Sequence, residues 1–214
     1  MRFAEAVERL AVLPEPLPAP AEALMPIVVG RAEWRPTRMA PPDRPGRAAA
    51  VLALLFPDDE DLARIVLIER TTGGGHHSGE VSLPGGKTEP EDADMTVTAL
   101  REAAEEVALD PVAAGVRVVG VLEPFWIPVS DFAVTPVVAV AERRPSLVAS
   151  PAEVARIVEA PMAMFLPDAP FEMVERTVRD WPLRYGAYAI DGLSVWGATA
   201  RVLSQLGAVL AGRD

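Results

Sequence analysis

Residues 83–109, LPGGKTEPEDADMTVTALREAAEEVAL, place many carboxylates around a Gly-Gly turn and one predicted helix. At about 100° per residue, Glu102, Glu105 and Glu106 fall on one face of that helix. Their i,i+3 and i,i+4 spacings bring the side chains within about 6 Å, where two carboxylates repel each other by roughly 2 to 3 kcal/mol at an effective dielectric near 20. A bound divalent cation would reverse the sign of that interaction, so the spacing raises the question of a metal site.

The same helix has a predicted apolar stripe opposite its glutamates. At helical spacing this stripe consists of Val97, Leu100, Ala104 and Val107. We therefore expect the stripe to pack on the core and the three glutamates to lie on the face away from it.

Two interpretations of the acidic face follow from the residues alone. Carboxylate oxygens are the ligands that Mg²⁺ and Mn²⁺ prefer, and both ions often recruit substrate phosphates. Gly85 and Gly86 lack a Cβ, so their backbone groups can approach the same ion or phosphate. The alternative is a solvated helix face, because alanine-rich helices with glutamate-rich outer faces are common and Arg101 can offset Glu105.

Other residues that could bind a metal or a substrate give weaker signals. His76 and His77 are the only histidines, and two ligands alone do not make a closed zinc site; His77 is the better candidate for a substrate contact. The glycines at 73–75 lack the Lys-Ser/Thr ending of a phosphate-binding P-loop, which favours a hairpin loop. The tryptophans are predicted to lie mainly in the core or at an interface, with adenine stacking by one of them left open.

Composition limits the class of protein. With 214 residues, half of them apolar, the chain can bury a sizeable core. A net charge of −11 argues against broad nucleic-acid binding, which depends on Lys and Arg. No run of about 18 apolar residues indicates a membrane span, the N-terminus lacks a signal-peptide pattern, and cysteine is absent. We expect a cytoplasmic protein that binds neither membranes nor nucleic acids.

The N-terminal part of the chain differs in composition from the rest. Residues 2–13 have helical apolar spacing, and residues 13–46 are proline-rich, which disfavours long helices and central strands. We predict a helix followed by an extended arm over 1–46, with a partly disordered linker as the alternative for the proline-rich part. Residues 47–214 are predicted to form the main domain.

Alternating and continuous apolar runs predict the regular structure of that domain. Strands are expected at 47–56, 63–70, 80–83, 116–125 and 132–142, a strand or short helix at 152–160, a helical turn at 162–166, a hairpin at 176–190 and a closing helix at about 195–210. Without a sustained βαβ rhythm, this order predicts an α/β (α+β) fold with a mixed sheet between helices.

The acidic stretch resembles a known family signature. Gly85-Gly86, Asp92 and REAAEEVAL at 101–109 resemble the Nudix box, the loop-helix signature of the Nudix hydrolases. Eight residues separate Asp92 from Arg101, where the family pattern has seven, and Ala108 replaces the usual glycine. The acidic core of the signature is complete.

A longer segment is similar to one branch of that family. IERTTGGGHHSGEVSLPGGKTEPED, residues 68–92, resembles the segment that coenzyme A pyrophosphatase-type Nudix proteins carry, and the longer spacing before the arginine is usual there. Arg70, His77, Gly79 and Glu80 match that pattern. Residues 130–140 and 196–203 also look like this branch. The departures are Thr71 for serine, Gly75 for a later arginine and Leu83 for phenylalanine.

The resemblance implies a Nudix-like α/β/α sandwich that hydrolyses a diphosphate linkage in coenzyme A or another nucleoside diphosphate derivative by metal-activated water. It implies Glu102 and Glu106 as the principal Mg²⁺ or Mn²⁺ ligands, and Glu105 as a further ligand or the base. The remaining expected roles are Arg101 in orienting the glutamates, the carbonyl of Gly86 or Gly85 in metal binding, Arg70, His77 and Gly85 in substrate binding, and Glu153 as an acid from a later loop. A ligand-sensing or protein-interaction domain without turnover is the alternative, and a homodimer is left open alongside a monomer.

Overall fold

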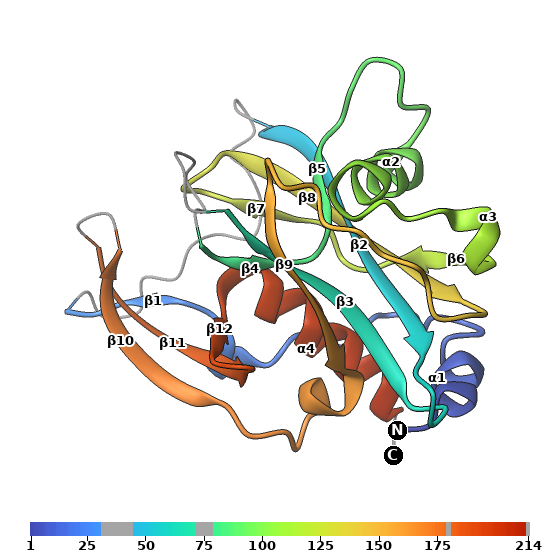
Figure 1. Ribbon diagram of the computed structural model, residues 1–214. Helices are drawn as coiled ribbons and strands as arrows, with labels where there is room; N and C mark the ends of the chain where they lie inside the picture. The colour runs from blue at the N-terminus through green and yellow to red at the C-terminus, as the bar shows by residue number, and fades with distance from the viewer. Residues whose placement is uncertain (31–44, 72–78, 179–180, 213–214) are drawn as a thin grey trace.

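The computed structural model describes residues 1–30, 45–71, 79–178 and 181–212. His77 and Gly75 lie outside these ranges. The helices and strands, shown in Figure 1, are α1 Phe3–Arg9, η1 Glu22–Leu24, β1 Ile27–Val28, β2 Arg47–Pro57, β3 Ala63–Arg70, β4 Val81–Ser82, β5 Gly85–Lys87, α2 Met95–Val107, α3 Pro111–Ala114, β6 Val116–Val121, β7 Phe125–Ile127, β8 Phe132–Ala141, β9 Val154–Pro161, η2 Met162–Phe165, β10 Glu172–Val178, β11 Trp181–Ile190, β12 Leu193–Val195 and α4 Gly197–Ala211.

The main sheet is mixed, as predicted. In the described residues it has eight strands, and β2 runs parallel to β8 and antiparallel to β3. The interior of β2 is buried almost continuously, which explains why its sequence is an unbroken apolar run rather than an alternating one. β9 pairs antiparallel with β3, so the strand alternative for residues 152–160 is the correct one.

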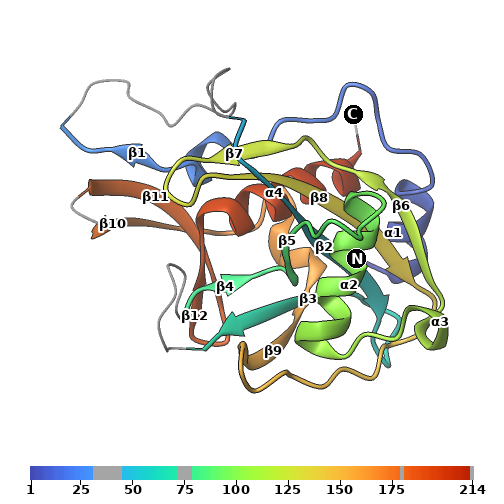
Figure 2. The same ribbon diagram turned by 90° about the horizontal axis from the view of Figure 1, so that it is seen from above.

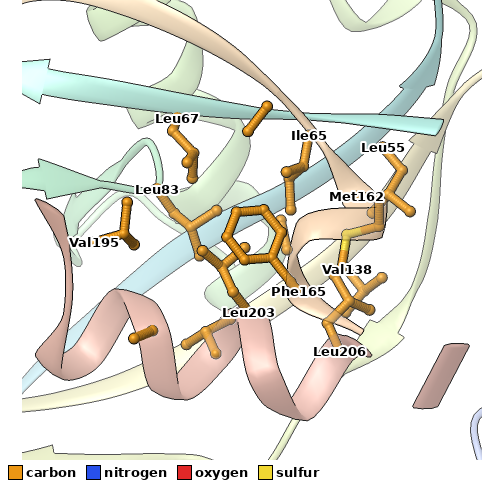
Figure 3. Packing of buried hydrophobic residues seen from close by; sticks show 14 of the residues in the cluster. Leu55, Ile65, Leu67, Leu83, Val138, Met162, Phe165, Val195, Leu203 and Leu206 are labelled. Carbon is orange, nitrogen blue, oxygen red and sulfur yellow. The ribbon is translucent and has the colours of Figure 1, made fainter. Parts of the chain in front are cut away.

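Helices cover both faces of this sheet. Ala99 and Ala103 of α2 pack with Leu52 and Leu54 of β2. On the other face, α4 packs through Leu203 and Leu206 against strand residues and Phe165 of η2 (Figure 3). Because neighbouring residues of β2 alternate between the two clusters, α2 and α4 lie on opposite faces, and the predicted α/β/α arrangement is confirmed.

A short insertion separates the two central strands and brings the Gly-Gly turn into the sheet. β2 and β3 pair only from Leu55 to Pro57, after which β4 pairs with β3 and β5 pairs with β2. Gly85 lies so close to β2 that a Cβ would be 2.3 Å from the Ala50 carbonyl oxygen, and its φ is +153°. Only glycine fits this position, which fixes the turn directly beneath α2.

A second sheet joins the N-terminal arm to the predicted hairpin. β10 and β11 form that hairpin, β12 pairs with the end of β11, and β1 from the arm pairs with β11. Ala6 and Leu10 from the N-terminal helical region belong to the same hydrophobic cluster as α4, so this region packs on the main core. Helix α1 lies within the range predicted as helical, and the described part of the arm, up to residue 30, contains η1 and β1. The domain boundary after residue 46 stays a prediction.

Two details of the predicted strand pattern were wrong. Residues 116–125 do not form one strand: β6 ends at Val121 and β7 begins at Phe125, both antiparallel to β8. Pro124 interrupts the ladder because it has no N–H to donate. Gly85 and Gly86, expected in a turn that begins at Pro84, belong to strand β5 because β2 offers them a free edge. Across the residues with assigned structure, no helix is both long and apolar enough to cross a membrane.

Candidate active site

Helix α2 is rotated relative to the prediction. Its buried residues are Thr98, Ala99, Ala103, Glu106 and Val107, whereas Val97 is 41% exposed and Ala104 is also exposed. The predicted apolar stripe was therefore wrong for Val97 and Ala104, whereas Val107 and Leu100 pack against the core as predicted. The small side chains of Ala99 and Ala103 let the helix approach the sheet closely, and this approach outweighs the larger apolar surface of Val97.

The prediction that all three glutamates lie on the face away from the core was wrong as well. The side chain of Glu106 is 1% exposed, that of Glu102 is 13% exposed, and that of Glu105 is 56% exposed. Glu106 thus lies on the inner side of the helix, toward the Gly-Gly turn. A buried carboxylate is costly unless it is paired and hydrogen-bonded, so its partners matter.

Glu106 is held by two partners from the sheet. Its Oε2 accepts a hydrogen bond from the Gly85 amide at 2.8 Å, and its Oε1 accepts one from Nη1 of Arg70 at 3.1 Å. Burial nevertheless raises the pKa of the Glu106 carboxyl to about 7, and the charges of Glu102 and Glu153 act in the same direction. Burial therefore disfavours the charged form of the Glu106 carboxylate at neutral pH.

Glu102 lies directly against the second glycine of the turn. A Cβ on Gly86 would be 2.5 Å from both carboxylate oxygens of Glu102, so the absence of a side chain there makes room for this carboxylate. Burial raises the pKa of Glu102 against the opposing effect of Arg101, whose Nη1 is 3.2 Å from its Oε1. The two glycines thus serve different acids: Gly85 donates to Glu106, and Gly86 accommodates Glu102.

Arg101 ties the helix to the loop before it. Its Nε and Nη2 donate to the two carboxylate oxygens of Asp92, both at 3.1 Å, and Nη2 also donates to the Lys87 carbonyl at 3.0 Å. Its Nη1 donates to Glu105 at 3.1 Å. The hydrogen bonds from Arg101 are the main reason that the pKa of Asp92 lies well below its usual range.

Asp92 is distinct from the residue that caps the helix. The N-cap is Asp94, whose Oδ1 accepts from the amides of Thr96 and Val97. Asp92 instead receives hydrogen bonds from Thr98 Oγ1 and from the Glu89 amide, in addition to Arg101. The loop therefore accommodates the longer spacing between Asp92 and Arg101 without losing their pairing.

We expect Arg101→Lys to destabilise the protein by about 2 kcal/mol at pH 7, because lysine cannot make the paired hydrogen bonds to the buried Asp92 carboxylate. The folded-state pKa of Asp92 is depressed, so this stabilisation is present above the unfolded pKa near 4 and fades as pH falls below it. Urea unfolding of both proteins from pH 3 to pH 7 measures the difference. Arg143→Lys, at an exposed position, is the control. If the difference in unfolding free energy between the two proteins does not change with pH, the stabilisation does not come from the pairing of Arg101 with the Asp92 carboxylate.

Glu153 comes close to this site from the loop before β9. Its Oε2 is 4.0 Å from Nη2 of Arg70, and its backbone carbonyl accepts from the Thr71 amide at 3.0 Å. The charge of Glu153 raises the pKa of both Glu102 and Glu106. The structure therefore places the later acid beside the predicted site, at the end of β3.

A family comparison agrees with this arrangement. The model of the NUDIX domain matches residues 46–172, which cover more than half of the chain. The chain belongs to the Nudix family.

Relatives with curated names extend this result. Nudix hydrolase 22, chloroplastic, of Arabidopsis thaliana is 39% identical over 176 residues, and Nudix hydrolase 15, mitochondrial, of the same plant is 38% identical over 179 residues. Each alignment covers 78% of this chain, but only 56% and 60% of the two plant proteins, so this Nudix chain spans little more than half of their length. An uncharacterized Nudix hydrolase, NudL, of Photorhabdus laumondii is 34% identical over 142 residues, which cover 66% of this chain and 74% of that protein. The predicted cytoplasmic location stays a prediction.

A solved structure shares the fold. The Nudix hydrolase RenU of M. smegmatis aligns with a TM-score of 0.53 and 20% identity, over 78% of this chain and 88% of that chain. Together with the relatives, this likeness supports the predicted Nudix fold.

The donor set of the Nudix site suits a hard divalent cation. No three Asp, Glu or His side chains in the described part of the chain already converge on one ion position, since Arg70 and Arg101 hold the carboxylates. Each carboxylate oxygen has two acceptor positions, so Glu102 and Glu106 keep capacity for a cation beside these partners. Nearby positive charge would also offset the repulsion between the glutamates.

Sequence reasoning named residues that the structure brings together, but it missed the contacts that organise them. Arg70 and Gly85 were predicted to bind substrate, whereas in the structure both hold Glu106. These contacts join residues 21 and 36 positions apart, so no local pattern could have shown them. The predicted contribution of His77 falls outside the described residues.

Proposed function

We propose that this Nudix chain hydrolyses a diphosphate linkage in coenzyme A or a related nucleoside diphosphate derivative, with Mg²⁺ or Mn²⁺ as cofactor. The observation that carries the proposal is the buried Glu106, held between Arg70 and the Gly85 amide with its pKa raised. A strained buried acid beside further carboxylates is typical of a functional site rather than of a solvated helix face.

Glu102 and Glu106 are the proposed principal metal ligands, with Glu105 and the carbonyl of Gly86 as further donors. When bound, the ion would sharpen the nucleophilic water and neutralise charge on the diphosphate. The chain contributes the geometry: Gly86 leaves space for Glu102, and Gly85 orients Glu106. Arg101 acts through Glu102 and Glu105 as a positioning residue.

Two acids are candidates for removing a proton from the attacking water. Glu105 is the most exposed of the three glutamates and is held at 3.1 Å by Arg101, so it reaches solvent from the site. Glu106 has a pKa near neutrality, which suits a base at pH 7. We assign the proton transfer to Glu105, which reaches solvent, and the metal contact to Glu106, whose oxygens are fixed by Arg70 and the Gly85 amide and each keep a second acceptor position.

The coenzyme A preference rests on residues 68–92 and their environment. Leu83, which replaces the usual phenylalanine, is buried in the main core and keeps the apolar anchor beneath the turn. Thr71, which replaces serine, keeps the hydroxyl and donates to the Ala152 carbonyl at 3.2 Å. The two replacements therefore preserve the chemistry of these positions.

Turnover is favoured over a ligand-sensing domain. A sensing domain needs no metal-activated water, so its signature acids are free to change. Here Glu102, Glu105, Glu106 and Arg101 are all present, and Arg101 is fixed by Asp92 and the Lys87 carbonyl. The complete set supports an enzyme.

A substrate panel tests the proposed reaction. We expect cleavage of coenzyme A or its acyl derivatives with Mg²⁺ or Mn²⁺, scored by phosphate-containing products, in preference to ADP-ribose, NADH and dinucleoside polyphosphates. If another member of the panel is cleaved best, the coenzyme A preference is wrong while the reaction class stands. If none is cleaved faster than by Glu106→Gln, the enzyme proposal is wrong for these substrates.

Metal binding is tested separately by calorimetric titration with Mg²⁺. We expect the wild-type protein to bind the ion and Glu102→Gln to bind it at least about tenfold more weakly, since one of the few anionic ligands is lost. Glu142→Gln, at an exposed position, is the control. Equal binding by Glu102→Gln and the wild type would remove Glu102 from the ligand set.

A further inference from the structure

Three side chains from separate elements form a stack next to the strand that leads into the Gly-Gly turn. Tyr185 of β11 is buried, and its ring lies 4.5 Å from the ring of Trp196 with an interplanar angle of 23°. The guanidinium of Arg176, from β10, lies over the Trp196 ring at 5.4 Å from its centroid. Tyr185 and Arg176 project from the same face of the β10–β11 hairpin, and Trp196 packs against both. Tyr185 is buried, Trp196 is half-buried and Arg176 is exposed.

The stack is placed beside the candidate active site. Trp196 is the residue before α4, whose Thr199 donates to the Val81 carbonyl of β4 at 3.0 Å, and β12 contacts β4 (Figure 2). Burial raises the pKa of Tyr185, and the charges of Arg176 and Glu80 act on the same hydroxyl. The backbone carbonyl of Glu80 accepts from the amide of Arg70, the arginine that holds Glu106.

Arg176 is the exposed member of this group of side chains. Arg176 makes no ion pair within the described ranges, although this chain has 31 acidic residues against 20 basic ones. Its cross-strand neighbour is Leu183, and the nearby ion pair between Glu175 and Arg184 belongs to the other face of the hairpin. A guanidinium that lies over an indole, and that has no carboxylate partner among the described residues, is suited to a flat, electron-rich ligand.

We propose that Trp196 and Arg176 bind the purine base of the nucleoside part of the substrate, with Tyr185 holding the indole in place. The inference rests on the proposed function, because it is the nucleoside diphosphate class that supplies a base next to a diphosphate. Aromatic and guanidinium groups bind bases by stacking on either face, and each stacked base contributes about 1 to 3 kcal/mol. The stack would thereby select nucleoside diphosphates over diphosphates without a base.

Binding of AMP tests the inference without hydrolysis. AMP has a base and one phosphate but no diphosphate linkage, and EDTA removes divalent metal. We expect the wild type to bind AMP more tightly than ribose 5-phosphate, measured by calorimetry. The AMP dissociation constant should rise at least about fivefold in Trp196→Leu and in Arg176→Gln, the lower limit for losing one stacking partner. That of ribose 5-phosphate should change by less than about twofold.

Arg184→Gln is the matched control, since it makes the same change on the opposite face of the hairpin and should leave AMP binding unchanged. Arg176 is exposed, so Arg176→Gln decides the matter if Trp196→Leu fails to fold. AMP binding no tighter than that of ribose 5-phosphate, or unchanged in Arg176→Gln, overturns the inference. Because the assay involves no turnover, its failure is distinct from a failure of the substrate panel.

Discussion

We expect Glu106→Gln to lower kcat/KM by about three orders of magnitude while making the metal-free protein more stable at pH 8. Glutamine keeps the size and the acceptor for the Gly85 amide but removes the negative charge. Losing a charged metal ligand costs several kcal/mol of transition-state stabilisation, which corresponds to a rate loss of this size. Steady-state kinetics on the best substrate of the panel measures it.

The gain in stability follows from the pKa of Glu106. Its folded-state pKa is about 7, above the unfolded value near 4.3, so the folded protein binds the proton more tightly. The wild type is therefore most stable, relative to the variant, below about pH 4, and it loses stability as pH rises toward 7. Above pH 7 the loss levels off at about 3 to 4 kcal/mol. Thermal unfolding in EDTA at pH 4, 6 and 8 follows this change.

Glu142→Gln serves as the control, because it removes an exposed carboxylate outside the site. It should change neither kcat/KM nor the pH dependence of stability. A Glu106→Gln protein that loses activity and stability together at pH 8 would show that Glu106 is mainly a structural ion-pair partner of Arg70. Loss of activity with a gain in stability identifies a residue that is kept for function at the expense of the fold.

The rotation of α2 shows how far local pattern could predict this site. The sequence contains both the acids and their spacing, and the resemblance to the Nudix box named them. A helical projection, however, counts Val97 by its apolar surface and places Glu106 on the outer face of the helix. In the structure the helix turns the small Ala99 and Ala103 toward β2, and Glu106 is buried with them. The orientation of α2 depends on how its side chains fit against β2 and on the contacts of Glu106 in the site. Hydrophobic periodicity measures neither of these.

Strands that depend on their own sequence were predicted, whereas strands that depend on pairing with distant segments were not. β2, β3, β8 and the β10–β11 hairpin were predicted because each is an apolar or alternating run of ordinary length. The insertion of β4 and β5 between β2 and β3 was not predicted, because it depends on where the two longer strands stop pairing. That insertion is what brings Gly85 and Gly86 under α2.

The two glycines of the turn allow the fold and the site to be perturbed separately. At Gly85 an added Cβ meets the backbone of β2 at 2.3 Å, and its φ of +153° disfavours any other residue. Neither constraint can be relieved by rotating a side chain. We expect Gly85→Ala to destabilise the protein by about 3 kcal/mol or more, with activity lost through the fold.

Gly86→Ala is expected to lower kcat/KM by about a hundredfold with a stability change of about 1 kcal/mol or less. Its added Cβ meets only the carboxylate end of Glu102, at 2.5 Å, and that side chain can move away. A displacement of about 1 Å in a catalytic group is enough to cost a hundredfold in rate. Calorimetry should show weaker Mg²⁺ binding in the same variant, because Glu102 is the displaced ligand.

Gly120→Ala is the matched control for this change. Its added Cβ also meets the end of a flexible side chain, Leu13 at 2.9 Å, so its cost in stability should be similar. Its kcat/KM and Mg²⁺ affinity should match those of the wild type. If Gly86→Ala behaves like Gly120→Ala in all three measurements, the position of Glu102 does not matter for turnover and Glu102 is not a metal ligand. If only Gly86→Ala loses rate and metal affinity, the space above Gly86 is required for the chemistry and not for folding.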